Sequence, residues 1–232
     1  MTNVMIRQPG YMPNVGFFKK IQSSDIFVFL DDVQFSKGSF DNRNRIKTPI
    51  GEVWITVPLA RPVFGKNLNE LLISYETDWQ KDHCNKIHEN YRSAPYFSSY
   101  WSDIEKILTH KYEKLIDLNF TLINYFNKGL DITTENIKSS ELSVAQTKTK
   151  RLIEICSKLN ATCYVAGFGA KNYLDEKLFL NSGIKLLYEN FIHQTYNQLY
   201  GNFIDNLSIM DLLMNEGPSS QKIISQSTNN SN

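Results

Sequence analysis

An eight-residue run, DIFVFLDD at residues 25–32, constrains the fold more than any other part of the sequence. It is apolar on both faces until Asp31, as expected of a strand that is buried in a parallel sheet. A short apolar segment at 4–8 and helical spacing over 15–24 precede it. Strand, helix and strand make a right-handed βαβ unit. The loop at 9–13 should therefore meet the pair Asp31-Asp32 at the carboxyl edge of the sheet.

The remaining pattern predicts a single-domain α/β fold. One mostly parallel sheet is expected from strands at 4–8, 25–31, 54–59, 162–167 and 184–190. Helices on both faces are expected from 15–24, 78–92, 100–129, 145–159, 173–182 and 208–215, the last with a capping box of Ser208 and Asp211. The outline is Rossmann-like or nucleotidyltransferase-like with a helical middle segment. We expect the domain to span 1–217 and a polar C-terminal tail to occupy 218–232.

Charge and cysteine content exclude several classes of protein. The chain has 25 Lys and Arg against 24 Asp and Glu in 232 residues, which argues against a protein that binds duplex nucleic acid. Cys84, Cys156 and Cys163 have neither disulfide-framework nor zinc-site spacing, and no other metal site is indicated. There is no signal peptide and no membrane span, so a cytoplasmic location is expected. The sequence leaves the cofactor unknown.

The densest polar cluster lies in the first quarter of the chain and is the main candidate site. Its substrate-binding candidates are Gln8, Tyr11, Asp31, Gln34, Asn42, Arg43, Asn44 and Lys47, with Asp32 as a candidate catalytic residue. Ligands of open α/β sheets bind at the carboxyl ends of strands. We predict that Arg43, Lys47 and Asp32 line one pocket for the anionic part of a substrate. The alternative is an ordinary solvated connection between strands.

Two further segments are candidates. In AGFGAKNYLD at 166–175, Gly167 and Gly169 could let backbone amides approach an anion, with Tyr173 beside them. We expect this turn to face the cleft of Gln8 and Asp32, although a purely structural turn explains the glycines as well. His193, just after the last strand, is a candidate general acid or base, or else a packed histidine.

Motifs in seven segments give the chain a resemblance to the WbqC-like family of bacterial proteins. They are Q-P-x-Y-x-P-x-x-G-x-F at 8–18, D-x-F-V-x-x-D-D-V-Q at 25–34, N-R-N-x-I-K at 42–47, W-x-T-V-P at 54–58, Y-x-x-A-P-x-F at 91–97, G-x-G-x-x-x-Y-L-D at 167–175 and L-S-x-x-D-L-L-x-N-x-G at 207–217. The chain departs from the family pattern at Asn14, where the pattern has an aromatic residue. The resemblance implies a place in O-antigen and other surface-polysaccharide biosynthesis.

The leading functional hypothesis is therefore a transferase or amide-forming ligase. It would attach an acyl or aminoacyl group from a donor to the amine of a nucleotide-linked amino-deoxy sugar, with an Asp or His as the base. A glycosyltransferase that uses a nucleotide sugar is the first alternative, with Asp31-Asp32 binding a metal and a sugar diphosphate. A non-catalytic accessory protein of polysaccharide assembly is the second.

Overall fold

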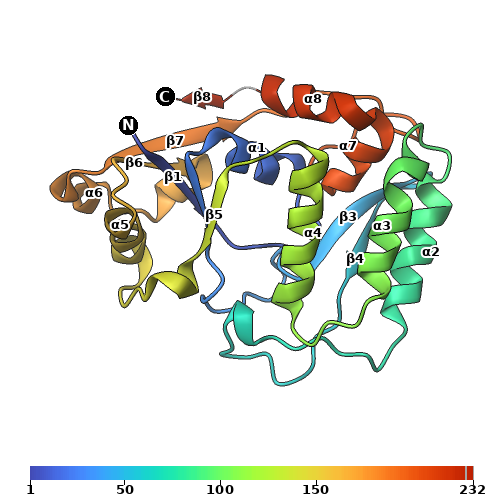
Figure 1. Cartoon of the computed structure of the whole chain (residues 1–232), viewed down its shortest axis with the longest axis horizontal. Helices are drawn as coiled ribbons and strands as arrows, with labels where there is room; N and C mark the ends of the chain where they lie inside the picture. The colour runs from blue at the N-terminus through green and yellow to red at the C-terminus, as the bar shows by residue number, and fades with distance from the viewer. Residues whose placement is uncertain (228, 232) are drawn as a thin grey trace.

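Five parallel strands in the order β5-β2-β1-β6-β7 organise the computed structural model, which describes residues 1–227 and 229–231 (Figure 1). The short β8 adds to β7 in the antiparallel direction. The fold is the expected α/β fold with a mostly parallel sheet. The strands are β1 (Asn3–Arg7), β2 (Ile26–Phe29), β5 (Glu135–Lys138), β6 (Cys163–Gly167), β7 (Lys185–Phe191) and β8 (Asn229–Ser231).

Side chains of the parallel strands alternate between two hydrophobic cores, because successive residues of a strand point to opposite faces. Val4 and Val28 face the core that is covered by α5 (Lys148–Lys158) and α6 (Glu176–Ser182). Met5 and Phe27 face the larger core, which includes α1 (Val15–Ser23) and α4 (Leu115–Gly129). Helices therefore cover both faces, and Figure 1 shows these two pairs on opposite sides of the sheet.

The expectation that 54–59 belongs to the main sheet is wrong. The first half of this segment, 54–56, lies in β4 (Gly51–Thr56), which pairs with β3 (Arg43–Thr48) in a separate antiparallel hairpin. The place in the parallel sheet belongs to β5, whose sequence ENIK has no apolar run. β5 lies at the edge of the parallel sheet, where a strand needs less apolar sequence.

The middle of the chain is helical, but the helix expected over 100–129 is two helices. After α2 (Trp79–Tyr91) come α3 (Phe97–Thr109) and α4, separated by residues 110–114. The backbone at 113–115 forms hydrogen bonds with the segment at 71–73: Leu115 N donates to Leu71 O at 2.9 Å, and Ile73 N donates to Glu113 O at 3.0 Å. Backbone groups used in this way cannot continue a helix.

A further helix follows α7 (Ile209–Glu216). After a turn at Gly217–Ser219, the segment expected as a polar tail forms the helix α8 (Ser220–Gln226), which buries Ile224. Ser208 caps α7 by accepting from Met210 N at 3.3 Å. Asp211 does not complete the capping box, because its carboxylate accepts from buried tyrosines instead.

Three single-turn helices connect other elements, at Leu68–Glu70, Ser139–Leu142 and Phe168–Asn172. In the part of the chain that the structure describes, none of the helices combines the length and the apolar character that crossing a membrane requires.

Candidate functional site

The chain changes direction across the sheet between β1 and β6. It first adds β2 and β5 on one side of β1, and then returns to add β6 and β7 on the other. In open α/β sheets, ligands bind outside the carboxyl ends of the strands at such a switch point. A cavity of about 850 Å³ lies there, lined by Arg7 and Gln8 at the end of β1, Tyr164 of β6, and the start of α5. We call it the switch-point cavity.

The loop after β1 forms one wall of this cavity through close backbone packing. A side chain at Gly10 would place Cβ 2.9 Å from the carbonyl oxygen of Phe40, so only glycine fits against residues 38–41. Asn119 of α4 donates to the carbonyls of Pro9 at 3.0 Å and Asp41 at 2.8 Å, which ties the two loops together.

Asn44 has a comparable anchoring role on the other side of the loop. It donates to the carbonyl of Met12 at 2.6 Å and also lines the cavity. Gln8 and Asn44 are thus the two residues of the predicted first-quarter cluster that line the switch-point cavity.

Three cations, Arg7, Lys148 and Arg151, line the cavity. Arg151 is paired with Asp32, with 2.5 Å between Nη2 and Oδ1. Neither Arg7 nor Lys148 forms an ion pair with any described residue. Lys148 is also the first residue of α5, where free backbone N–H groups and the helix dipole favour an anion. The cavity therefore presents two cations, Arg7 and Lys148, without an ion-pair partner among the described residues, beside an Arg151 that Asp32 neutralises.

A carboxyl group faces the same cavity. Asp41 is 3% exposed, and its Oδ2 accepts from Ser39 Oγ at 2.5 Å. Burial raises the pKa of Asp41, and the Ser39 hydrogen bond and the charge of Arg7 oppose that rise only in part. A carboxyl with a raised pKa near a cationic wall is suited to exchange a proton with a bound ligand.

The acidic pair after β2 has a supporting role in the structure. Asp31 accepts from Ser140 N at 3.0 Å and Ser140 Oγ at 2.7 Å, and Asp32 accepts from Ser139 Oγ while it pairs with Arg151. The two carboxylates fix the segment after β5 and hold Arg151 at the cavity. Neither of them lines the cavity itself.

The predicted grouping of Asp32, Arg43 and Lys47 in one pocket is not what the structure has. Lys47 is buried at the far end of β3, where its Nζ donates to Gln198 Oε1 at 2.9 Å and to Asn202 O at 2.6 Å. Arg43 and Lys47 share one face of β3, but they are four residues apart, so about 13 Å of extended strand separates the two cations.

Arg43 and Asn42 line a different hollow, which is described below. Gln34 is exposed and forms an isolated bridge with Asn67. Tyr11 is fully buried, with its hydroxyl 2.9 Å from Nδ1 of His83. Burial lowers the pKa of His83 to about 4, so this contact holds a neutral imidazole.

The turn after β6 reaches the same edge of the sheet as Arg7. A Cβ on Gly167 would lie 3.9 Å from Arg7 Nη1 and from Lys20 Nζ, and Lys20 is paired with Glu189. No atom of the described residues lies within 4 Å of a Cβ placed on Gly169. Of the three candidates in this segment, Tyr173 lines the cavity.

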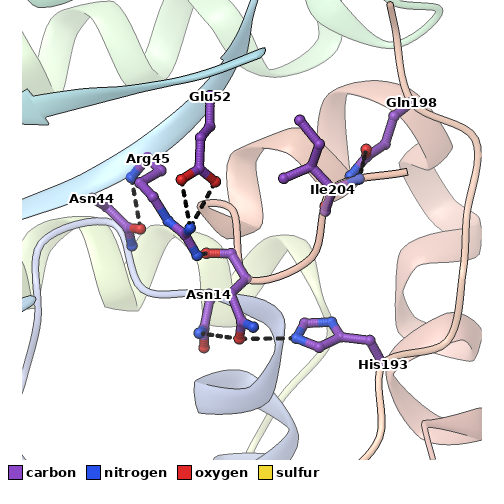
Figure 2. A network of polar contacts seen from close by, with 8 residues as sticks. Asn14, Asn44, Arg45, Glu52, His193, Gln198 and Ile204 are labelled. Atoms are coloured by element: carbon purple, nitrogen blue, oxygen red, sulfur yellow. Dashed lines mark hydrogen bonds and ion pairs between the residues drawn. The ribbon is translucent and has the colours of Figure 1, made fainter. Parts of the chain in front are cut away.

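His193 does not line the cavity but is linked through the side chain of Asn206 to Asn14, which does (Figure 2). Its Nε2 is 3.0 Å from Asn206 Oδ1, which also accepts from Asn14 Nδ2 at 3.1 Å. Asn14 Oδ1 in turn accepts from Phe17 N, which fixes the orientation of both amides. Because Asn206 Oδ1 can only accept, His193 carries the proton on Nε2. Asn14 thus gives α1 its N-cap and a polar edge to the cavity.

Arg7, Asp41, Lys148 and Arg151 line the cavity but were not predicted from the sequence. A signal existed for the cations: Arg7 ends the first strand, and TKTKR at 147–151 begins a helix that follows a strand. In a βαβ unit such a helix begins at the carboxyl edge of the sheet. Among the described residues, no group of three or more His, Cys, Asp or Glu side chains could hold a metal ion.

The fold and the cavity together define a doubly wound α/β protein with a cationic cavity at its switch point. A sequence model of the WbqC-like protein family matches residues 8–223, and the chain belongs to this family. The chain is 37% identical over 220 residues to uncharacterized protein Rv1507c of Mycobacterium tuberculosis (strain ATCC 25618 / H37Rv), covering 94% of this chain and 95% of that protein. No solved structure matches the chain.

Proposed function

We propose that this protein is a transferase or amide-forming ligase of surface-polysaccharide biosynthesis. It binds a nucleotide-linked amino-deoxy sugar in the switch-point cavity and transfers an acyl or aminoacyl group to the sugar amine. One observation carries the proposal: the same cavity contains two cations without an ion-pair partner among the described residues, Arg7 and Lys148, and the buried carboxyl of Asp41. The family resemblance supports the polysaccharide context.

The cations and the size of the cavity support a nucleotide-linked ligand. A volume of about 850 Å³ lies within the range of roughly 300–1,000 Å³ of small-molecule sites. Arg7 presents a planar fork that can meet two phosphate oxygens, and the first turn of α5 adds backbone donors. Arg151, held in place by Asp32, would contribute a third positive group.

Asp41 is the proposed base in place of Asp32. In the reaction, the amine nitrogen attacks the acyl carbon, a C–N bond forms, and the bond between the acyl carbon and its carrier breaks. The proton of the amine passes to Asp41, and the leaving group departs with the bonding electron pair. Asp32 is less suited to this step because Arg151 and Ser139 already occupy its carboxylate.

The glycosyltransferase alternative is less well supported. It required the carboxylates of Asp31 and Asp32 to be open to a metal and a sugar diphosphate, yet both are engaged by Ser139, Ser140 and Arg151. The accessory-protein alternative would lead us to expect an apolar patch without a pocket, and it does not account for a cavity that combines cations with a buried acid.

Titration calorimetry with a panel of nucleotide diphosphate-linked amino sugars tests the proposal. For the sugar that binds, Arg7→Gln should raise the Kd at least tenfold, and Arg7→Lys should recover part of the loss. Arg92→Gln, which removes an exposed arginine at the end of α2, is the matched control and should leave the Kd unchanged.

Mass spectrometry after incubation with candidate acyl donors would then detect the amide product. The proposal fails if no nucleotide sugar binds, or if Arg7→Gln and Arg92→Gln have equal effects.

A further inference from the structure

A second hollow of about 620 Å³ lies beside the β3–β4 hairpin, under the loop at 58–64. Its walls are mainly apolar, with Phe35, Leu59 and Phe64 among them. Its charged groups are Lys37, Arg43 and Arg61, and no Asp or Glu lines it. We call it the hairpin cavity.

The hairpin cavity is distinct from the switch-point cavity. The segment at 38–44 separates them: Ser39 and Asp41 line the switch-point cavity, whereas Gly38, Asn42 and Arg43 line the hairpin cavity. A ligand in one hollow is therefore bound by different side chains from a ligand in the other.

The cations of the hairpin cavity have no carboxylate partners. None of the three forms an ion pair within the described residues. Arg43 is held in place, since Nη2 donates to Gly38 O at 2.5 Å, Nε donates to Ser39 O at 3.3 Å, and the guanidinium lies 4.3 Å from the ring centre of Trp54. Because the groups that hold this guanidinium are neutral, its positive charge is not offset by a carboxylate and can attract a bound anion.

Phe64 makes the apolar part of the hollow unusual. Its side chain is 93% exposed although it borders the cavity, so a large aromatic ring stands in water beside an apolar wall. An apolar ligand segment lying between Phe64 and Leu59 would remove both from water, which is favourable in proportion to the area covered.

We propose that the hairpin cavity binds an amphipathic anion, a single apolar chain with a phosphate or carboxylate head. The chain lies against the apolar wall and the ring of Phe64, and the head is bound by Arg61, Lys37 and Arg43. Complementary charge and shape select this class: a neutral apolar ligand leaves the cations unused, and a small inorganic anion leaves the apolar wall in water. The inference is independent of the function proposed for the switch-point cavity.

Octyl phosphate is the probe, with octyl glucoside and inorganic phosphate as matched ligands that each lack one half of it. Calorimetry should give octyl phosphate a Kd at least tenfold below that of either control ligand. Because Trp54 lies against Arg43, binding should also change tryptophan fluorescence, and Trp54→Phe should remove most of that change.

Variants locate the binding. Phe64→Ala and Arg61→Gln should each weaken octyl phosphate at least fivefold, and both positions are exposed, so the fold should tolerate the changes. Ile50→Ala is the matched control, since Ile50 is 92% exposed and lies outside the cavity. It should have no effect, and Arg7→Gln in the switch-point cavity should have none either.

The proposal is overturned if octyl glucoside or inorganic phosphate binds as well as octyl phosphate, or if Phe64→Ala does not exceed Ile50→Ala. Loss of octyl phosphate binding in Arg7→Gln alone would place the ligand in the switch-point cavity. Sedimentation with anionic phospholipid vesicles that depends on Phe64, without binding of octyl phosphate, would assign the surface to a bilayer and also overturn it.

Discussion

Asp41 and Asp211 are both buried carboxyls, and burial raises the pKa of each, yet their surroundings differ. Asp41 lines the switch-point cavity and has a single side-chain hydrogen-bond partner, Ser39. Asp211 is enclosed between α2 and α7, where it accepts from the hydroxyls of Tyr91 at 2.9 Å and Tyr196 at 2.8 Å. The difference between the two lies in access and not in burial: a ligand in the cavity can approach Asp41, whereas the tyrosine hydroxyls occupy Asp211.

The largest expected effect is a loss of stability when Asp211, the enclosed carboxyl, is replaced. Asp211→Ala leaves the buried hydroxyls of Tyr91 and Tyr196 without an acceptor and opens a void, so the free energy of unfolding should fall by about 3–5 kcal/mol. Urea denaturation followed by circular dichroism measures it. Asp41→Ala should cost less than half as much, because Asp41 adjoins an open cavity; equal losses would contradict the distinction.

His83 of α2, another buried titratable group, predicts a pH dependence. Burial lowers the pKa of His83 from 6.5 to about 4, so below pH 6.5 the unfolded state binds a proton that the folded state does not. Stability should therefore fall as the pH drops from 6.5 to about 4, by roughly 3 kcal/mol from this group. Denaturation at a series of pH values should show a slope that His83→Gln removes, and an unchanged slope in that variant would refute the assignment.

Asp41→Asn tests whether the carboxyl that adjoins the switch-point cavity acts as the base. If Asp41 accepts the proton in acyl transfer, this change should lower kcat by about 10²-fold or more while the Kd of the nucleotide sugar stays within about threefold. In the parent protein kcat should rise with pH as the Asp41 carboxyl ionises, above the usual range for an aspartate because its pKa is raised. A variant that retains its activity and the same pH profile would show that another group accepts the proton.

The smallest effect is expected at Arg43. Arg43→Lys should leave nucleotide-sugar binding within twofold, since Arg43 does not line the switch-point cavity. It should cost about 0.5 kcal/mol of stability through the weakened contact with the ring of Trp54. Calorimetry measures the binding and denaturation measures the stability. A tenfold loss of nucleotide-sugar binding would show that Arg43 does contribute to the switch-point cavity.

The candidate site was predicted in part, since Gln8, Asn44 and Tyr173 line the cavity. Gln8 lines the cavity because it comes right after β1, and Asp32 reaches it indirectly through Arg151. Arg43 and Lys47 failed as predicted partners because they lie at opposite ends of β3 in an antiparallel hairpin, where Arg43 contacts Trp54 and Lys47 contacts Gln198. No local pattern could reveal Asp41, since its position depends on Asn119, which lies 78 residues further along the chain.

The sequence by itself determined the parallel sheet, because strands buried on both faces must be apolar throughout, as IFVF and CYVAG largely are. It also determined the end of α6 at Gly183, whose φ of 71° suits glycine. Only the tertiary structure decided that β5 is the edge strand, that 54–59 leaves the sheet, and that Arg7, Lys148 and Asp41 share one cavity. The physical reason is that apolar periodicity is a local property of the chain, whereas the pairing of edge strands and the meeting of polar side chains depend on contacts between distant segments.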